Sequence, residues 1–148
     1  MSGREPQETR APRMGTLARL PVFLSLHGKR AVIAGGSAAA AWKAELLSAA
    51  GASVEVFADD ICGALAALAD EPPGGAITLY RRQWTPLDLR EAGIAIGAFD
   101  HGDDAAVFAA AARAAGVPVN VIDKPAFCDF SFGAIVNRSP LMIAISTD

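Results

Sequence analysis

A run of small residues between an expected strand and an expected helix can bind phosphate. Here Gly35-Gly36-Ser37-Ala38-Ala39 follows the apolar run at 30–34. In the G-x-G-x-x-G/A pattern the first glycine allows a tight turn, and the middle glycine lets backbone N–H groups approach a pyrophosphate. Ser37 stands at the middle position and Ala40 at the last. The pattern favours dinucleotide binding at Gly35, Gly36, Ser37, Ala38 and Ala39, with an ordinary strand–loop–helix turn as the alternative.

Acidic residues follow two of the expected strands. Asp59 lies 24 residues after Gly35, and Asp60 follows it. An acid near this place accepts hydrogen bonds from the adenosine ribose of NAD and repels the extra phosphate of NADP. Capping of the next helix is the alternative, and it needs only one carboxylate. Asp123 follows the fifth strand and would face the same crevice. It could take a proton while a hydride leaves for a nicotinamide, or it could be a surface acid paired with Lys124.

Other polar groups near strand ends are weaker candidates. His101 follows the fourth strand and could act as an acid or base near neutral pH, although a solvated loop histidine is the commoner case. Lys124 and Arg138 could bind an anionic substrate, or could be solvated surface charges.

The elements that must position these residues alternate between strand and helix. Such an order predicts a Rossmann-like, doubly wound α/β fold with a parallel sheet of about five strands and helices on both faces. The first helix should carry Trp42, Leu46 and Ala50 on its apolar stripe. Ser37 is the expected N-cap of this helix. Strands are expected at 30–34, 53–57, 77–81, 94–98 and 117–122. Helices are expected at 37–50, from Asp59 or Asp60 to 69, and from Asp103 to 115, with a helical turn at 85–89.

Two further strand-like runs, 130–136 and 141–146, have no helix between them and predict an antiparallel hairpin. An exposed apolar hairpin needs a partner. We therefore expect 126–148 to be a hairpin segment for dimerisation, following a nucleotide-binding domain at 17–125.

The start of the chain is polar. We expect a flexible tail at 1–16, which lacks the apolar region of a signal peptide.

Composition narrows the class of protein. The chain has 148 residues, 52% of them hydrophobic and 20% charged, with a net charge of −3. These values predict one domain with a real core and argue against general nucleic-acid binding. No uninterrupted apolar run reaches the length of a membrane-spanning helix. The two cysteines and two histidines lack metal-ligand spacing, so we expect no metal site, and a reducing cytoplasm suits isolated thiols.

Several linked segments, taken in order, resemble the amino-terminal module of siroheme synthases, the precorrin-2 dehydrogenase / sirohydrochlorin ferrochelatase family. The resemblance runs from about residue 20 to residue 147, and Arg138–Thr147 is its most specific part. The other segments are Leu20-Pro21-Val22-Phe23, Leu26–Arg30, the glycine turn with Lys43, Leu46-Leu47 followed by Gly51-Ala52, Arg82–Leu89, Asn120–Asp123 and Cys128-Asp129-Phe130.

The resemblance implies an enzyme in which NAD oxidises precorrin-2 to sirohydrochlorin, with ferrous iron as the substrate of a second, chelating step. It places the cofactor on the glycine turn and near Asp59 and Asp60, and it implicates Asp123 in both steps. Lys124 and Arg138 are candidates for binding the carboxylates of the tetrapyrrole. It also implies a homodimer that exchanges the strands after the nucleotide-binding fold. The family usually continues past residue 147 with a helical segment, which we expect this chain to lack.

Two rival functions remain. The glycine turn and Asp59 fit equally a module that senses NAD without chemistry, although such a module has no need of Arg138–Thr147. A cofactor-free dimer scaffold is favoured by Ser37 and Phe99, because the family has a glycine and a small polar residue at these positions.

Overall fold

The computed structural model describes residues 13–146. Most of the predicted tail, residues 1–12, lies outside the described residues, and so do residues 147–148. Residues 13–16 are exposed and belong to no helix or strand.

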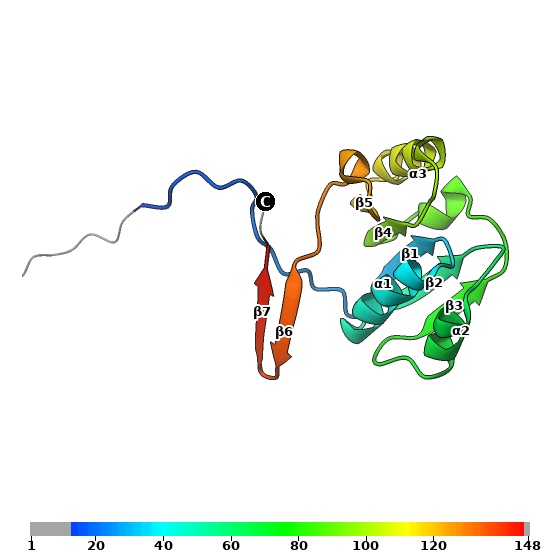
Figure 1. Cartoon of the computed structure of the whole chain (residues 1–148), viewed down its shortest axis with the longest axis horizontal. Helices are drawn as coiled ribbons and strands as arrows, with labels where there is room; N and C mark the ends of the chain where they lie inside the picture. The colour runs from blue at the N-terminus through cyan, green and yellow to red at the C-terminus, as the bar shows by residue number, and fades with distance from the viewer. Residues whose placement is uncertain (1–12, 147–148) are drawn as a thin grey trace, which may run out of the picture.

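A five-stranded parallel sheet forms the centre of the molecule, in the order β3-β2-β1-β4-β5. The chain first builds outward from β1 to β3, and then returns to the other side of β1 to add β4 and β5 (Figure 1). The carboxyl ends of β1 and β4 therefore border the point at which the strand order reverses, where ligands of such sheets bind. The strands are β1 (Arg30–Ala34), β2 (Ser53–Phe57), β3 (Ile77–Tyr80), β4 (Ile94–Gly97) and β5 (Val119–Val121).

Helices cover both faces of the sheet, which confirms the predicted fold class (Figure 1). The first face is covered by α1 (Ala38–Ala49) and α2 (Gly63–Asp70), and its core includes Leu47 and Leu65. The second face is covered by α3 (Gly102–Ala114) and the short helix η1 (Pro86–Leu89), and its core includes Phe108. Alanines make up much of both helix–sheet contacts, and their small side chains let the helices lie close to the strands.

The predicted apolar stripe of α1 is wrong. Trp42 is 57% exposed, Leu46 is half-buried and Ala50 is exposed. The face against the sheet instead carries small residues and one leucine, namely Ala40, Ala41, Ala44, Leu47 and Ser48. The buried Ser48 hydroxyl donates to the carbonyl of Gly75 at 2.6 Å and accepts from the amide of Gly74 at 3.3 Å. Small residues let α1 pack closely on the sheet, and the Trp42 indole stays on the outer side of the helix.

The helix starts agree with the sequence only in part. Ser37 caps α1, as predicted, by accepting from the amide of Ala40 at 3.3 Å. Asp59 and Asp60 do not cap α2, which begins after Cys62, because the amide of Cys62 is held by the carbonyl of Gly36 at 2.9 Å. Asp103 lies within the first turn of α3 and not at its cap, a position where its charge favours the helix dipole.

The predicted hairpin is present as β6 (Ala134–Arg138) and β7 (Leu141–Ile145), paired antiparallel. It extends away from the parallel sheet (Figure 1), and all its strand residues are exposed. β6 begins later than expected because Phe130 and Phe132 pack against the core of the first face. The register places residues 134, 136, 138, 141, 143 and 145 on one side of the hairpin, where Arg138 is the single charged residue.

Phe108 should dominate the packing of the second face. It is completely buried, whereas its neighbour Val107 is 63% exposed. Phe108→Ala should lower the free energy of unfolding by about 3–5 kcal/mol, and Val107→Ala should change it little. Urea denaturation followed by circular dichroism measures both, and equal losses in the two variants would contradict this account of the core.

Candidate functional site

The glycine turn brings backbone segments close together at the carboxyl edge of the sheet. Gly35 has a φ of 122°, and a Cβ there would lie 2.6 Å from the carbonyl oxygen of Ala98. A Cβ on Gly36 would overlap the carbonyl oxygen of Asp60. The fold therefore requires glycine at both positions, because a side chain at either would collide with a backbone carbonyl.

The first turn of α1 supplies donors for an anion. Helix geometry leaves the amides of Ala38 and Ala39 without intrahelical acceptors, and the helix dipole places positive charge there. Ser37, Ala38 and Ala39 are all exposed. Because the Ser37 oxygen accepts from the amide of Ala40, its hydroxyl proton remains available for donation. The residues present fit the pyrophosphate of a dinucleotide, and the serine at the middle position is compatible with an anion at these amides.

Asp59 and Asp60 follow β2 and are exposed beside this turn. The Asp59 carboxylate accepts from the side-chain amide of Gln83. Asp60 lies against the turn through its backbone carbonyl. Sequence reasoning did not single out Gln83, although it lies within the 82–89 segment that carries part of the family resemblance.

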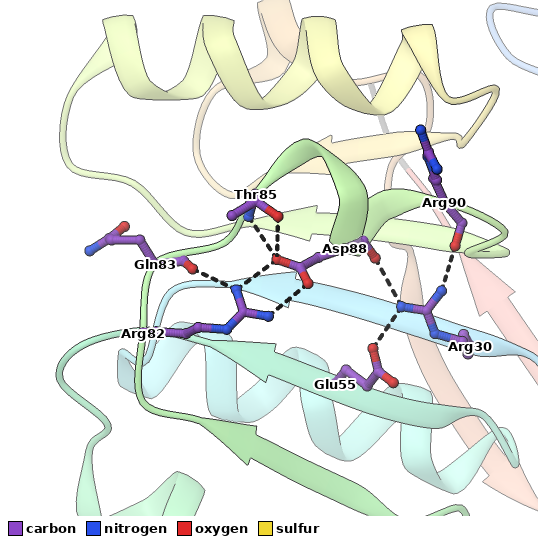
Figure 2. Close-up of polar contacts among 7 residues, drawn as sticks. All are labelled: Arg30, Glu55, Arg82, Gln83, Thr85, Asp88 and Arg90. Atoms are coloured by element: carbon purple, nitrogen blue, oxygen red, sulfur yellow. Dashed lines mark hydrogen bonds and ion pairs between the residues drawn. The ribbon is translucent and has the colours of Figure 1, made fainter.

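Behind Gln83 lies an ion-pair network that the sequence did not reveal (Figure 2). Arg82 binds both carboxylate oxygens of Asp88 at 2.8 Å. Asp88 also accepts from the amide of Thr85 at 2.7 Å and its hydroxyl at 3.0 Å. Nearby, Arg30 pairs with Glu55 at 2.7 Å and donates to the backbone carbonyl of Asp88 at 2.9 Å. The network ties the loop after β3 to β1 and β2.

Asp123 occupies a tight turn at the end of β5. It has a φ of 58°, a conformation that Asp and Asn tolerate better than most residues. The amide of Lys124 donates to the carbonyl of Val121 at 3.1 Å and closes the turn. The Cys128 thiol accepts from the amide of Val121 and donates to its carbonyl, each at 3.2 Å. These bonds hold the exposed Asp123 carboxylate at the carboxyl edge of the sheet.

Lys43 of α1 is the cation that interacts electrostatically with Asp123. Its ammonium group lies 4.0 Å from the centre of the Phe132 ring. Burial lowers the pKa of Lys43, and the negative charge of Asp123 acts in the opposite direction. Lys43 also lines an open cleft of about 430 Å³ between α1 and the start of β6. The other residues of the cleft are Trp42, Leu46, Phe132, Gly133, Ala134 and Ile135.

The remaining sequence candidates are more dispersed. Lys124 does not pair with Asp123 through its side chain, because its ammonium group donates to the carbonyl of Asp100 at 3.4 Å. Arg138 lies at the turn end of β6 and binds the carbonyl of Asn137 at 2.9 Å. Since the hairpin extends away from the sheet (Figure 1), one copy of the chain does not bring Arg138 to the glycine turn. His101 is exposed immediately before α3.

Phe99 makes its contacts within the fold, against residues of the second face. Its ring is half-buried and packs against Phe108, with the ring centres 5.3 Å apart. It belongs to the core of the second face and covers Gly97, where a Cβ would lie 2.7 Å from the ring. The aromatic ring is thus accommodated by the glycine at the end of β4.

Comparison with known proteins identifies the family. Residues 22–134 match the family model described as putative NAD(P)-binding. The chain belongs to this NAD(P)-binding family. It is 44% identical over 128 residues to the siroheme synthase of Pseudomonas entomophila, and 45% identical over 128 residues to that of Pseudomonas putida. Each alignment covers 86% of this chain and 27% of the relative, so the chain spans about a quarter of the length of these proteins. The predicted resemblance to siroheme synthases is confirmed.

A solved structure shares the fold of this NAD(P)-binding chain. "SirC, precorrin-2 dehydrogenase" superposes with a TM-score of 0.67 at 19% identity, covering 88% of this chain and 62% of that chain. Residues 13–146 contain no helix with the length and hydropathy needed to cross a bilayer. The same residues hold no group of three or more His, Cys, Asp or Glu side chains arranged for a metal ion.

The Asp88 network should make stability depend on pH. Hydrogen bonds from Arg82, followed by those from Thr85, lower the pKa of Asp88 from 3.8 to about 2. Because the folded state has the lower pKa, the stabilisation is present above about pH 4 and is lost as the pH falls toward 2. Asp88→Asn should therefore lower Tm at pH 6, and the difference from wild type should shrink between pH 4 and 2.

Thermal unfolding from pH 6 to 2 tests this expectation. Asp70→Asn, at the exposed end of α2, is the matched control and should follow the wild-type curve. A deficit of Asp88→Asn that stays constant down to pH 2 would contradict the role given to its charge.

Proposed function

We propose that this chain is an NAD-dependent precorrin-2 dehydrogenase, which oxidises precorrin-2 to sirohydrochlorin in siroheme synthesis. The observation that carries the proposal is the identity of 44% to a siroheme synthase over a region that contains both the glycine turn and Asp123. The fold places both features at the carboxyl edge of one sheet. The proposed NAD-binding domain is 17–125, and the proposed dimerisation segment is 126–148.

The cofactor-binding residues of the proposal are Gly35, Gly36, Ser37, Ala38 and Ala39, with Asp59 and Asp60. The exposed amides of the first turn of α1 would bind the pyrophosphate, and the Ser37 hydroxyl would add a donor. Asp59 would accept from the ribose hydroxyls, which favours NAD over NADP. NAD supplies the hydride acceptor when bound.

Asp123 is the proposed catalytic base. Dehydrogenation removes a hydride, which carries two electrons, and a proton from the reduced macrocycle, and Asp123 would accept that proton. Lys124 and Arg138 are the proposed partners of the substrate carboxylates, with Arg138 contributed across a dimer. Lys43 adds a cation to the apolar cleft beside Asp123, which suits a flat macrocycle that carries carboxylates.

The proposal has two finer parts, the first from the family resemblance and the second from the cysteines. Ferrous iron would be a second substrate, with Asp123 taking pyrrole N–H protons during insertion. The enzyme would act in the cytoplasm, where Cys62 and Cys128, both unbridged, stay reduced.

Asp123→Asn should abolish NADH formation from precorrin-2 and NAD under anaerobic conditions, with a loss of at least about 100-fold. Asparagine keeps the left-handed turn and the shape of the side chain but cannot accept the proton. Calorimetric titration with NAD should give the wild-type Kd, and Asp70→Asn should keep full activity. Wild-type turnover by Asp123→Asn would remove Asp123 from the mechanism.

The same assay separates the two rival functions. A wild-type chain that binds NAD but forms no NADH from precorrin-2 would be a sensor module. A chain that shows no heat and no thermal shift at millimolar NAD would be a scaffold.

We also propose that the chain is a homodimer formed through the hairpin. One side of the hairpin carries Val136, Leu141, Ile143 and Ile145, all of them exposed in a single chain. A continuous apolar surface of this kind is characteristic of an interface, and a second copy of the chain would cover it.

Ile143→Glu should convert the dimer to a monomer, because it places a charge in the middle of the apolar side. Sedimentation velocity measures the change, with Val107→Glu on the exposed side of α3 as the control. A monomeric wild-type chain, or a dimeric Ile143→Glu variant, would overturn the proposed interface.

A further inference from the structure

The loop between β3 and η1 contacts the Asp59 carboxylate, which follows β2. Gln83 donates its side-chain amide to Asp59. Arg82 donates to the backbone carbonyl of the same Gln83 at 2.9 Å. Figure 2 shows Gln83 and Arg82 next to Asp88, which anchors the group. Arg82 therefore links the backbone of Gln83 to Asp88.

Ion pairing and aromatic contacts hold the Arg82 side chain in this loop. Two of its nitrogens bind the two oxygens of Asp88, and its guanidinium carbon lies 4.7 Å from the centre of the Phe57 ring. Phe57 stacks on Tyr80 with ring centres 4.8 Å apart, so the arginine lies over aromatic rings at the ends of β2 and β3. A bidentate pair of this geometry fixes the guanidinium plane.

The ion pair of Arg82 with Asp88 bears on cofactor selectivity, because Asp59 is proposed to bind the adenosine ribose of the cofactor. An acid at this place accepts from the ribose hydroxyls of NAD, whereas NADP carries a phosphate there and needs a cation. Arg82 is linked to Asp59 through Gln83 and could serve as that cation, but Asp88 neutralises its charge and holds it in the loop. The loop thus favours the binding of NAD over that of NADP.

We propose that the loop 82–88 determines cofactor selectivity: Gln83 is a positioning residue that orients Asp59 toward the ribose hydroxyls, and Asp88 keeps Arg82 from binding the phosphate of NADP. This inference rests on the proposed function, because it requires a dinucleotide on the glycine turn. It adds residues to the cofactor site that neither the sequence patterns nor the comparisons assign.

Titration of the full chain with NAD and with NADP tests the inference without any turnover. Gln83→Leu removes the amide at an exposed position and should raise the Kd for NAD by about three- to tenfold, with no change in Tm. Asp88→Asn keeps the shape of the side chain but releases Arg82. It should lower the Kd for NADP by about tenfold and leave that for NAD within about twofold.

Two double variants identify the arginine that is released. Arg81 is the adjacent exposed arginine and provides the matched control. Asp88→Asn/Arg82→Ala should lose the gain in NADP affinity, whereas Asp88→Asn/Arg81→Ala should keep it. A gain that disappears with Arg81 and persists without Arg82 would overturn the assignment.

The outcomes also separate this inference from the function on which it rests. If the wild-type chain binds NAD, and both Gln83→Leu and Asp88→Asn leave the ratio of the two dissociation constants unchanged, the selectivity role is wrong and the dehydrogenase proposal stands. If the wild-type chain binds neither dinucleotide, both proposals fail. Thermal unfolding at pH 7 confirms that each variant is folded before it is titrated.

Discussion

The absence of side chains at Gly35 and Gly36 is the constraint on which the site depends. A Cβ at either position would collide with a backbone carbonyl, that of Ala98 or that of Asp60. The amide of Gly35 also donates to the carbonyl of Phe57 at 2.9 Å. Two glycines thus bring the ends of β1, β2 and β4 into contact, and the start of α1 is placed at the junction.

Other polar contacts join the strands of the sheet to the segments around them. Arg30 joins β1 to β2 through Glu55, and it joins η1 through the carbonyl of Asp88. On the side of β5, the Asp129 carboxylate binds the amide of Val119 at 3.1 Å, and the side chain of Asn120 binds the carbonyl of Phe130 at 2.8 Å. The chain after β5 is therefore fastened along that strand before it leaves toward the hairpin.

Local patterns in the sequence predicted most of the fold. Short apolar runs such as 94–98 predicted buried strands, and Ser37 was recognisable as a cap because capping depends on near neighbours in sequence. The exposed Trp42 was not predictable in this way, because burial on α1 depends on how closely the helix approaches the sheet. The capping role expected of Asp59 or Asp60 was wrong for a similar reason: the carbonyl of Gly36, distant in sequence, fixes where α2 starts.

The residues of the candidate site also divide into those that local sequence patterns indicate and those that tertiary contacts bring in. The glycine turn and Asp123 were evident from their places at strand ends. Gln83 and Lys43 lie in segments that carry the family resemblance, but tertiary contacts give them their places in the site. Gln83 contacts Asp59, and Lys43 interacts with Phe132 and Asp123. No spacing rule connects residues that approach each other through different strands and helices.

The alanine-rich inner face of α1 has a consequence for how this protein tolerates mutation. Ala40 and Ala44 are fully buried, so their methyl groups act as spacers that fix the height of the helix above the strands. A bulkier side chain at either place would raise the helix, and the first-turn amides would move with it. Substitutions in the interior would thus alter affinity for an anion at the surface, even in a chain that still folds.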